Sequence, residues 1–218
     1  MVRPAAVLWD MDGTLVDTEP YWIETEFALA ERFGGRWSDE QALDLVGRDL
    51  LSSGEYIREH MPLDLPPAEI VELLLDGVVA RLDENVPWRP GARELLAAIR
   101  AAGIPCALVT MSYERFAAPI LAHLAPGSFQ VVVTGDQVTR GKPDPEPYLT
   151  AARLLGVDPR DCLAIEDSTP GATSAAAAGC SVLVVPHHVP VPPGDRRVFA
   201  DSLTDVDASR LSDYLLPV

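Results

Sequence analysis

The chain has few basic residues, almost no lysine and no long apolar run. Lys and Arg total 17 against 33 Asp and Glu, which gives the 218 residues a formal net charge of -16. A protein that neutralises nucleic-acid phosphates needs a basic surface. No apolar run approaches the ~20 residues of a membrane-spanning helix, and the apolar run at the N-terminus is too short for a signal peptide. We therefore expect a cytoplasmic protein with neither nucleic acid nor a membrane as its partner.

Cysteine is also scarce. The three cysteines are odd in number and widely spaced, and each lies within or next to an apolar segment: Cys106, Cys162 and Cys180. This pattern indicates small core residues in a reducing compartment, and it argues against disulfides or a cysteine metal site.

Lys142 is the single lysine among the 17 basic residues. An ammonium is a compact, strongly hydrated point charge, which the guanidinium of arginine is not. Lys142 lies between Gly141 and Pro143, and Pro143 and Pro145 stiffen its loop. The alternative is a solvated loop lysine that is alone by chance.

Short apolar runs alternate with helical patterns along most of the chain. This order predicts right-handed crossovers and a parallel sheet, with ligands bound beyond the carboxyl ends of the strands. The expected strands are 5–10, 103–110, 129–136, 162–167 and 180–185, and the expected helices are 91–102, 113–124, 145–156 and 170–178.

One segment breaks this alternation. Residues 21–84 contain helical patterns only, with hinges expected near 16–20 and 86–90. We predict an α/β core domain formed by 1–16 and 88–218, and a helical cap domain formed by 17–87.

Acidic residues follow two of the expected strands. Asp10 and Asp12 stand at i and i+2 after the first strand, and Glu166 and Asp167 end another. Like charges held this close are costly without a cation or a proton between them, and carboxylate oxygens suit Mg²⁺. The alternatives are a turn with solvated aspartates and a helix cap at Asp167 or Ser168.

Four segments, DMDGT, LVTMS, GKPDPEPY and IEDSTPGA, occur in this order along the chain. Together they resemble the haloacid dehalogenase superfamily, in particular its helical-cap subgroup with the beta-phosphoglucomutase-like phosphatases. The resemblance implies a doubly wound parallel-sheet (Rossmann-like) core with an inserted, mobile, all-helical cap. It also implies a phosphomonoester hydrolase that uses Mg²⁺ and a small phosphorylated metabolite, such as a sugar phosphate.

The same resemblance implies roles for single residues. Asp10 is the expected nucleophile, Asp12 the general acid and then base, Thr110 a phosphoryl ligand, and Lys142 the group that neutralises the phosphoryl group and orients Asp10. The metal ligands would be Asp10, the backbone carbonyl of Asp12, Asp167, and Glu166 directly or through water. The expected substrate-binding residues are Met111 and Ser112 after Thr110, and Glu19, Trp22 and Arg48 in the cap.

Two other functions stay open. A sugar phosphomutase would use the same core residues, but Trp22 stands where beta-phosphoglucomutases usually carry a histidine, which favours hydrolysis. A non-catalytic metal-binding or interaction protein on the same scaffold is the alternative from another class. A monomer or weak dimer is expected. His187 and His188 have no partner at metal-ligand spacing in the sequence, so we interpret them as part of a surface loop.

Overall fold

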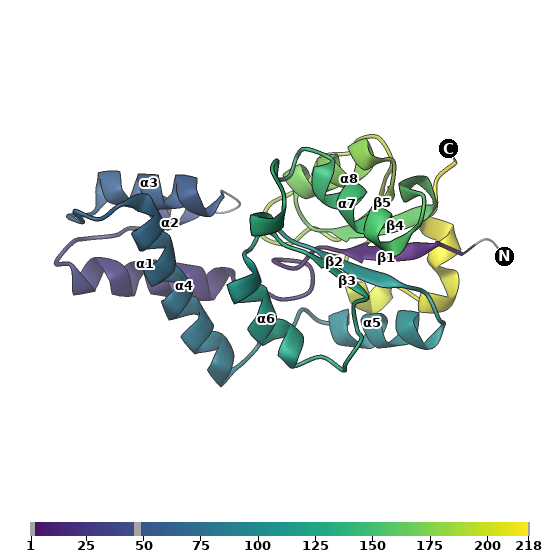
Figure 1. Cartoon of the computed structure of the whole chain (residues 1–218), viewed down its shortest axis with the longest axis horizontal. Coiled ribbons are helices and arrows are strands. Elements are labelled where there is room, and N and C mark those ends of the chain that lie inside the picture. The colour runs from purple at the N-terminus through teal and green to yellow at the C-terminus, as the bar shows by residue number, and fades with distance from the viewer. Residues whose placement is uncertain (1–2, 46–48, 218) are drawn as a thin grey trace. The chain divides into compact units, whose positions relative to one another are not determined.

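The computed structural model describes residues 3–45 and 49–217, and the chain divides into two compact units (Figure 1). The first unit comprises Met1–Asp17, Trp88–Glu114 and Leu124–Val218, and the second comprises Thr18–Pro87 and Arg115–His123. The division of the chain at 17 and 87 into a core and a cap domain stays a prediction.

The first unit is built on a six-stranded parallel sheet with the strand order β3-β2-β1-β4-β5-β6. Its central strands are continuous apolar runs because both faces of the sheet are covered. The strands are β1 (Ala6–Trp9), β2 (Cys106–Val109), β3 (Val131–Val133), β4 (Cys162–Glu166), β5 (Ser181–Val184) and β6 (Arg197–Phe199).

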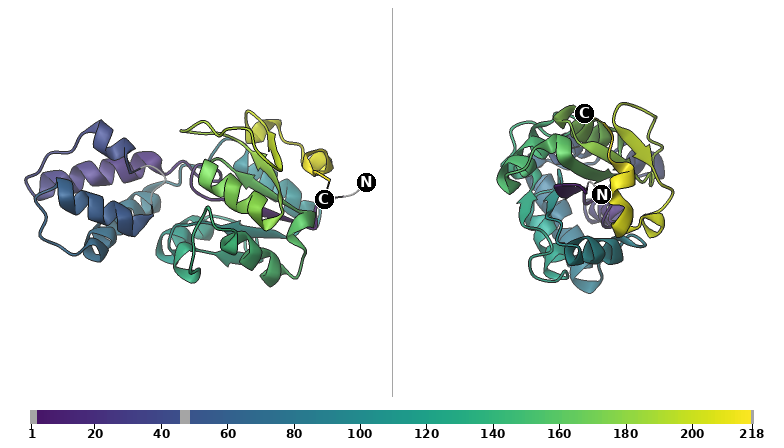
Figure 2. Two further views of the ribbon diagram at one scale, coloured as in Figure 1. Left: turned by 90° about the horizontal axis from the view of Figure 1, so that it is seen from above. Right: turned by 90° about the vertical axis from the view of Figure 1, so that its right-hand side faces the viewer.

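Helices cover both faces of this sheet. Figures 1 and 2 show α7 (Glu146–Leu155) and α8 (Thr169–Ala178) on one face and α5 (Ala92–Ala101) on the other. Helix α5 buries Leu95, Leu96 and Ile99, which the helical spacing predicts. The α/β fold expected from the sequence, a doubly wound parallel sheet, is therefore confirmed.

Among the residues that the structure describes, β6 is the strand that was not predicted from the sequence. Its three residues are half-exposed or exposed, whereas every residue of β1, β2, β4 and β5 is buried. A short edge strand needs no apolar run, so its sequence gives no pattern to detect. In the described part of this unit, the structure also has four 3₁₀ helices: Gly135–Gln137, Pro159–Asp161, Leu203–Asp205 and Ala208–Tyr214.

In the described residues of the second unit, all regular secondary structure is helical, as the sequence predicts for residues 21–84. Its helices are α1 (Glu19–Arg32), α2 (Asp39–Leu43), α3 (Leu50–His60), α4 (Pro67–Glu84) and most of α6 (Glu114–Ala122). Arg115 of α6 forms ion pairs with Glu72 and Asp76 of α4. Among the described residues, no helix has the length and apolar character needed to cross a membrane.

Glu26 of α1 makes the stability of the second unit depend on pH. Its carboxylate is buried and accepts a hydrogen bond from Trp37 Nε1 at 3.0 Å. Burial raises its pKa from 4.5 to about 7, against the lowering effect of the Trp37 hydrogen bond. Between pH 4.5 and about 7 the folded state therefore binds more protons than the unfolded state. The contribution of Glu26 to stability is fully present below this range and is lost as the pH rises through it.

We expect Glu26→Gln to remove this dependence. At pH 8 the variant should be more stable than the wild type by on the order of 1–3 kcal/mol, because no charge has to be buried. Urea unfolding followed by tryptophan fluorescence at several pH values between 5 and 8 measures the effect. Exposed Glu59→Gln is the matched control. Equal pH slopes for Glu26→Gln and the wild type would contradict this role of Glu26.

Candidate active site

The carboxyl ends of three neighbouring strands bring the predicted catalytic residues together. Asp10 follows β1, and its backbone N–H donates to Ile165 O of β4 at 3.0 Å. Thr110 follows β2, and Glu166 is the last residue of β4. Because β1 lies between β2 and β4 in the sheet, the polar groups at these ends meet at one edge.

The ammonium of Lys142 binds to all three strand ends. Its Nζ donates to Asp10 Oδ1 at 2.6 Å, to Val109 O of β2 at 2.9 Å and to Glu166 Oε1 at 2.7 Å. An ammonium has three N–H donors, and these contacts use all of them. The side chain is only 6% exposed, so Lys142 is a buried charge and not a solvated loop lysine. Although burial opposes it, the two carboxylates raise the pKa of Lys142 and keep it charged.

Glu166 is fully buried, and both of its oxygens accept hydrogen bonds. Oε1 accepts from Lys142 and, at 2.7 Å, from the hydroxyl of Tyr148; Oε2 accepts from Ser168 Oγ at 3.2 Å. A Cβ added at Gly171 of α8 would lie 1.8 Å from Oε1, so only glycine leaves room for this carboxylate. These contacts fix Glu166 in place as the partner of Lys142.

Asp10 and Asp167 carry the negative charge that Lys142 does not balance. Oxygens of Asp10, Glu166 and Asp167 lie within 4.8 Å of one another. Burial and the neighbouring carboxylates raise the pKa of Asp10 to about 7 and that of Asp167 to about 9. When Asp10, Glu166 and Asp167 are all ionised, three carboxylates against one ammonium leave two negative charges, which a divalent cation would balance in place of bound protons.

Asp10 Oδ2 supplies a second observation that fits a cation. It is buried and has no hydrogen-bond partner, and a buried acceptor without a partner is costly. A carboxylate oxygen of this kind is a suitable ligand for Mg²⁺. The donor set of Asp10 and Asp167 therefore fits the magnesium ion expected from the sequence.

The side chain of Asp12 lies beside the phosphoryl-binding candidates. Asp12 Oδ2 accepts from Thr110 Oγ1 at 3.2 Å and from Ser112 Oγ at 2.7 Å. The N–H of Ser112 donates to Thr110 Oγ1 at 3.0 Å. The turn after Asp12 depends on Gly13, which has a φ of 85°, and a Cβ there would lie 2.0 Å from Asp167 Oδ2. Gly13 therefore leaves room for the carboxylate of Asp167 beside this turn.

The other predicted substrate residues lie in different places. The thioether of Met111 accepts from the N–H of Lys142 at 3.2 Å, so this side chain supports the lysine loop. Glu19 and Trp22 belong to α1 of the second unit, where Trp22 packs on Phe116 with the ring centroids 5.3 Å apart. Arg48 lies outside the described residues.

Two groups at this site were not predicted from the sequence: the hydroxyl of Tyr148 and the backbone carbonyl of Val109. Tyr148 ends the GKPDPEPY segment, six residues after Lys142, but nothing in the sequence indicates that it faces Glu166. Asp17 and Arg89 were also missed, and they lie in a separate cluster of the first unit.

A protein-family model described as haloacid dehalogenase-like hydrolase matches residues 4–179 of the chain. The match covers the sheet strands up to β4, helix α8 and every residue of the candidate site described above.

Individual proteins match over similar lengths. N-acetylmuramic acid 6-phosphate phosphatase of Pseudomonas aeruginosa is 40% identical over 191 residues, covering 84% of this chain and 82% of that protein. Bifunctional riboflavin kinase/FMN phosphatase of Arabidopsis thaliana is 33% identical over 184 residues, but the match spans only 48% of that longer protein. The crystal structure of CbbY from Rhodobacter sphaeroides in complex with phosphate has a TM-score of 0.81 and 29% identity, covering 93% of this chain and 96% of that one.

Proposed function

The chain belongs to the haloacid dehalogenase-like hydrolase family, and we propose that it is a magnesium-dependent phosphomonoesterase for a small phosphorylated metabolite. A sugar phosphate is the favoured class, because a relative with 40% identity is named for a phosphorylated amino sugar. The acidic composition of the chain, with a net charge of -16, gives no support to a nucleic-acid substrate.

The observation that carries this proposal is the state of Asp10. Lys142 holds one of its oxygens at 2.6 Å, and the other oxygen is buried without a partner. Burial and Glu166 raise the pKa of Asp10 to about 7, and the ammonium of Lys142 opposes this rise and so favours the anionic form. An anionic carboxylate fixed in orientation is what attack on phosphorus requires.

In the proposed first step, an oxygen of Asp10 attacks the phosphorus of the ester. The bond between phosphorus and the ester oxygen breaks, and Asp12 gives its proton to the leaving oxygen. The hydroxyls of Thr110 and Ser112 now donate to Asp12, and they would turn from Asp12 to donate hydrogen bonds to phosphoryl oxygens when substrate binds. The product of this step is an aspartyl-phosphate on Asp10 and a free alcohol.

In the second step, Asp12 takes a proton from water as the water attacks the same phosphorus. The bond between phosphorus and Asp10 breaks, which restores the carboxylate and releases inorganic phosphate. Asp10 and Asp167, together with the backbone carbonyl of Asp12, would hold Mg²⁺, which when bound neutralises charge on the phosphoryl oxygens. Glu166 would act mainly through Lys142, since both of its oxygens already accept hydrogen bonds.

A sugar phosphomutase is the second candidate, because it would form the same aspartyl-phosphate and return the phosphoryl group to sugar. Glu19, Trp22 and Arg48 are proposed to recognise the substrate in either case. Trp22 is packed against Phe116, and an indole offers no base to assist transfer to a second sugar hydroxyl. Hydrolysis is therefore the favoured reaction.

Removal of the metal should abolish turnover. We expect the purified chain to hydrolyse p-nitrophenyl phosphate with Mg²⁺, and EDTA to lower the rate by at least ~10²-fold, because the excess negative charge of Asp10 and Asp167 then repels the phosphate. Excess Mg²⁺ should restore the rate. A screen of sugar phosphates, with phosphate release and isomerisation measured in parallel, separates hydrolysis from mutase activity. Full activity in EDTA would contradict the magnesium requirement.

A further inference from the structure

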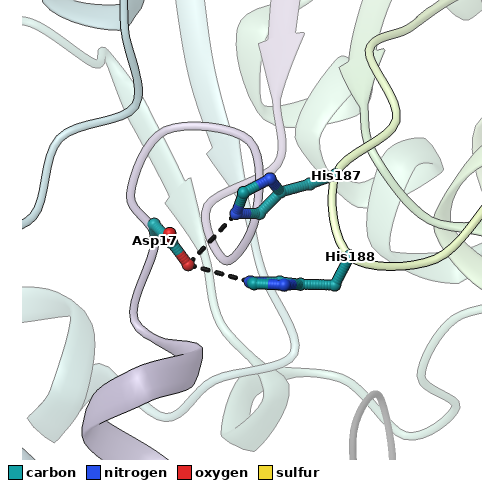
Figure 3. A group of neighbouring side chains, drawn as sticks. All are labelled: Asp17, His187 and His188. Atoms are coloured by element: carbon teal, nitrogen blue, oxygen red, sulfur yellow. Dashed lines mark hydrogen bonds and ion pairs between the residues drawn. The ribbon is translucent and has the colours of Figure 1, made fainter.

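Asp17, His187 and His188 form a second cluster of possible metal ligands in the first unit (Figure 3). Asp17 follows the turn after β1, and the two histidines follow β5. Both imidazole rings point toward the same carboxylate oxygen: His187 Nε2 lies 3.1 Å and His188 Nε2 lies 2.9 Å from Asp17 Oδ1. The sequence separates Asp17 from His188 by 171 positions, so the sequence analysis had no spacing from which to predict this group.

The distances within this cluster are close to those of a tetrahedral metal centre. Zinc–nitrogen and zinc–oxygen bonds of about 2.0 Å place two ligand atoms of a tetrahedral site about 3.3 Å apart. The three ligand atoms here lie within 4.8 Å of one another, and both distances to Asp17 are slightly shorter than the tetrahedral value. A small outward movement of the side chains would admit an ion.

Both histidines contact the same oxygen of Asp17. His188 Nε2 makes a hydrogen bond with Asp17 Oδ1, whereas His187 Nε2, which is buried, lies 3.1 Å from the same oxygen without the alignment of a hydrogen bond. The three side chains are 20–39% exposed, so an ion can reach them from solvent. A buried imidazole nitrogen that faces a carboxylate and a second imidazole is a suitable ligand for a borderline-soft cation.

Arg89 is the group that opposes a cation here. Its Nη1 contacts His187 Nδ1, and its charge is close enough to interact with Asp17 and Asp167. A metal on His187 Nε2 requires the ring proton on Nδ1, which would then face another donor. Arg89 therefore has to move away from His187 when an ion binds, and its positive charge repels the ion and weakens binding.

We propose that Asp17, His187 and His188 bind a transition-metal dication of the Zn²⁺ class, separate from the magnesium ion of the candidate active site. The two imidazoles select against Mg²⁺, which prefers oxygen ligands. Asp17 is the last residue of the first unit before the chain enters the second, and Trp88, next to Arg89, is the first residue after it returns. A bound ion would tie the first of these two connections to the loop that follows β5.

Cobalt absorption tests the site directly. Co²⁺ is added to the full chain with Asp167→Asn, in excess Mg²⁺, so that the carboxylate cluster of the active site does not bind it. We expect one equivalent of Co²⁺ to give a tetrahedral visible spectrum without thiolate bands, because the three cysteines are buried and free. His187→Gln and His188→Gln should each weaken binding by ~10–100-fold, whereas exposed His123→Gln is the matched control and should not.

Arg89→Met provides a second test, because removal of its charge affects Co²⁺ affinity only if the cluster binds the ion. Loss of its positive charge should tighten Co²⁺ binding by about tenfold. Thermal unfolding of each variant checks that the fold is retained, and exposed His188→Gln is the variant that should fold most easily. Three results would each overturn the proposal. These are the absence of a stoichiometric Co²⁺ spectrum, equal Co²⁺ binding by the histidine variants and the wild type, and loss of Co²⁺ binding in Arg89→Met.

Discussion

Asp10→Asn should reduce phosphatase turnover by at least ~10³-fold. The amide has nearly the shape of the carboxylate but is a much weaker nucleophile, and it cannot form the acyl phosphate. It also removes one of the three carboxyl groups whose oxygens lie within 4.8 Å of one another. The fold should be retained, because Asp10 Oδ1 can be replaced by an amide oxygen that still accepts from Lys142.

Steady-state hydrolysis of p-nitrophenyl phosphate measures this loss, and exposed Asp195→Asn is the matched control. Trapping adds a direct readout: borohydride reduction of wild-type enzyme during turnover should convert position 10 to homoserine, which mass spectrometry detects. Turnover of Asp10→Asn close to the wild-type rate would remove Asp10 from the role of nucleophile. Homoserine at another aspartate would assign the role elsewhere.

Lys142→Met should lower both stability and activity. Without the ammonium, the carboxylates of Asp10 and Glu166 remain buried without their shared donor. Removal of one partner from a buried ion pair typically costs about 3–5 kcal/mol. In catalysis the variant loses the charge that orients Asp10. The interaction of this charge contributes about 4 kcal/mol or somewhat less, so we expect its loss to lower the rate ~10²–10³-fold.

A second substitution separates these two effects of Lys142. Adding Glu166→Gln to Lys142→Met removes one unpaired buried charge and keeps the acceptor for Tyr148. The double variant should therefore recover much of the unfolding free energy but none of the activity. Urea unfolding and hydrolysis rates measure the two quantities, with exposed Arg36→Met as the control for loss of a surface cation. Recovery of activity together with stability would show that Lys142 has a structural role only.

Much of the fold follows from patterns local to the sequence. The runs that end at Asp10, Thr110 and Glu166 are buried strands because a parallel sheet covered on both faces excludes polar side chains from its centre. Their polar residues then have to lie at the carboxyl ends. The position of Asp10 next to Glu166 follows from the same topology, since β1 pairs with β4.

Partner choice within the site was harder to predict. Lys142 stands out in the sequence as the single lysine, but its contacts span 132 positions to Asp10 and 33 to the carbonyl of Val109. Tyr148 occupies a helix position that any core aromatic could fill, and its hydroxyl finds Glu166 only after α7 has packed on the sheet. The strand β6 lacks an apolar run, so it too escaped detection.

The sequence alone therefore determined the five apolar strands, the main helices and which strand ends carry carboxylates, because apolar periodicity and chain order are local properties. Only the tertiary structure decided that Lys142 joins three strand ends, and that Asp17 meets His187 and His188. The physical reason is that a hydrogen bond or a metal ligand set depends on side-chain direction to within a few tenths of an ångström, and that direction is set by packing between segments far apart in the chain.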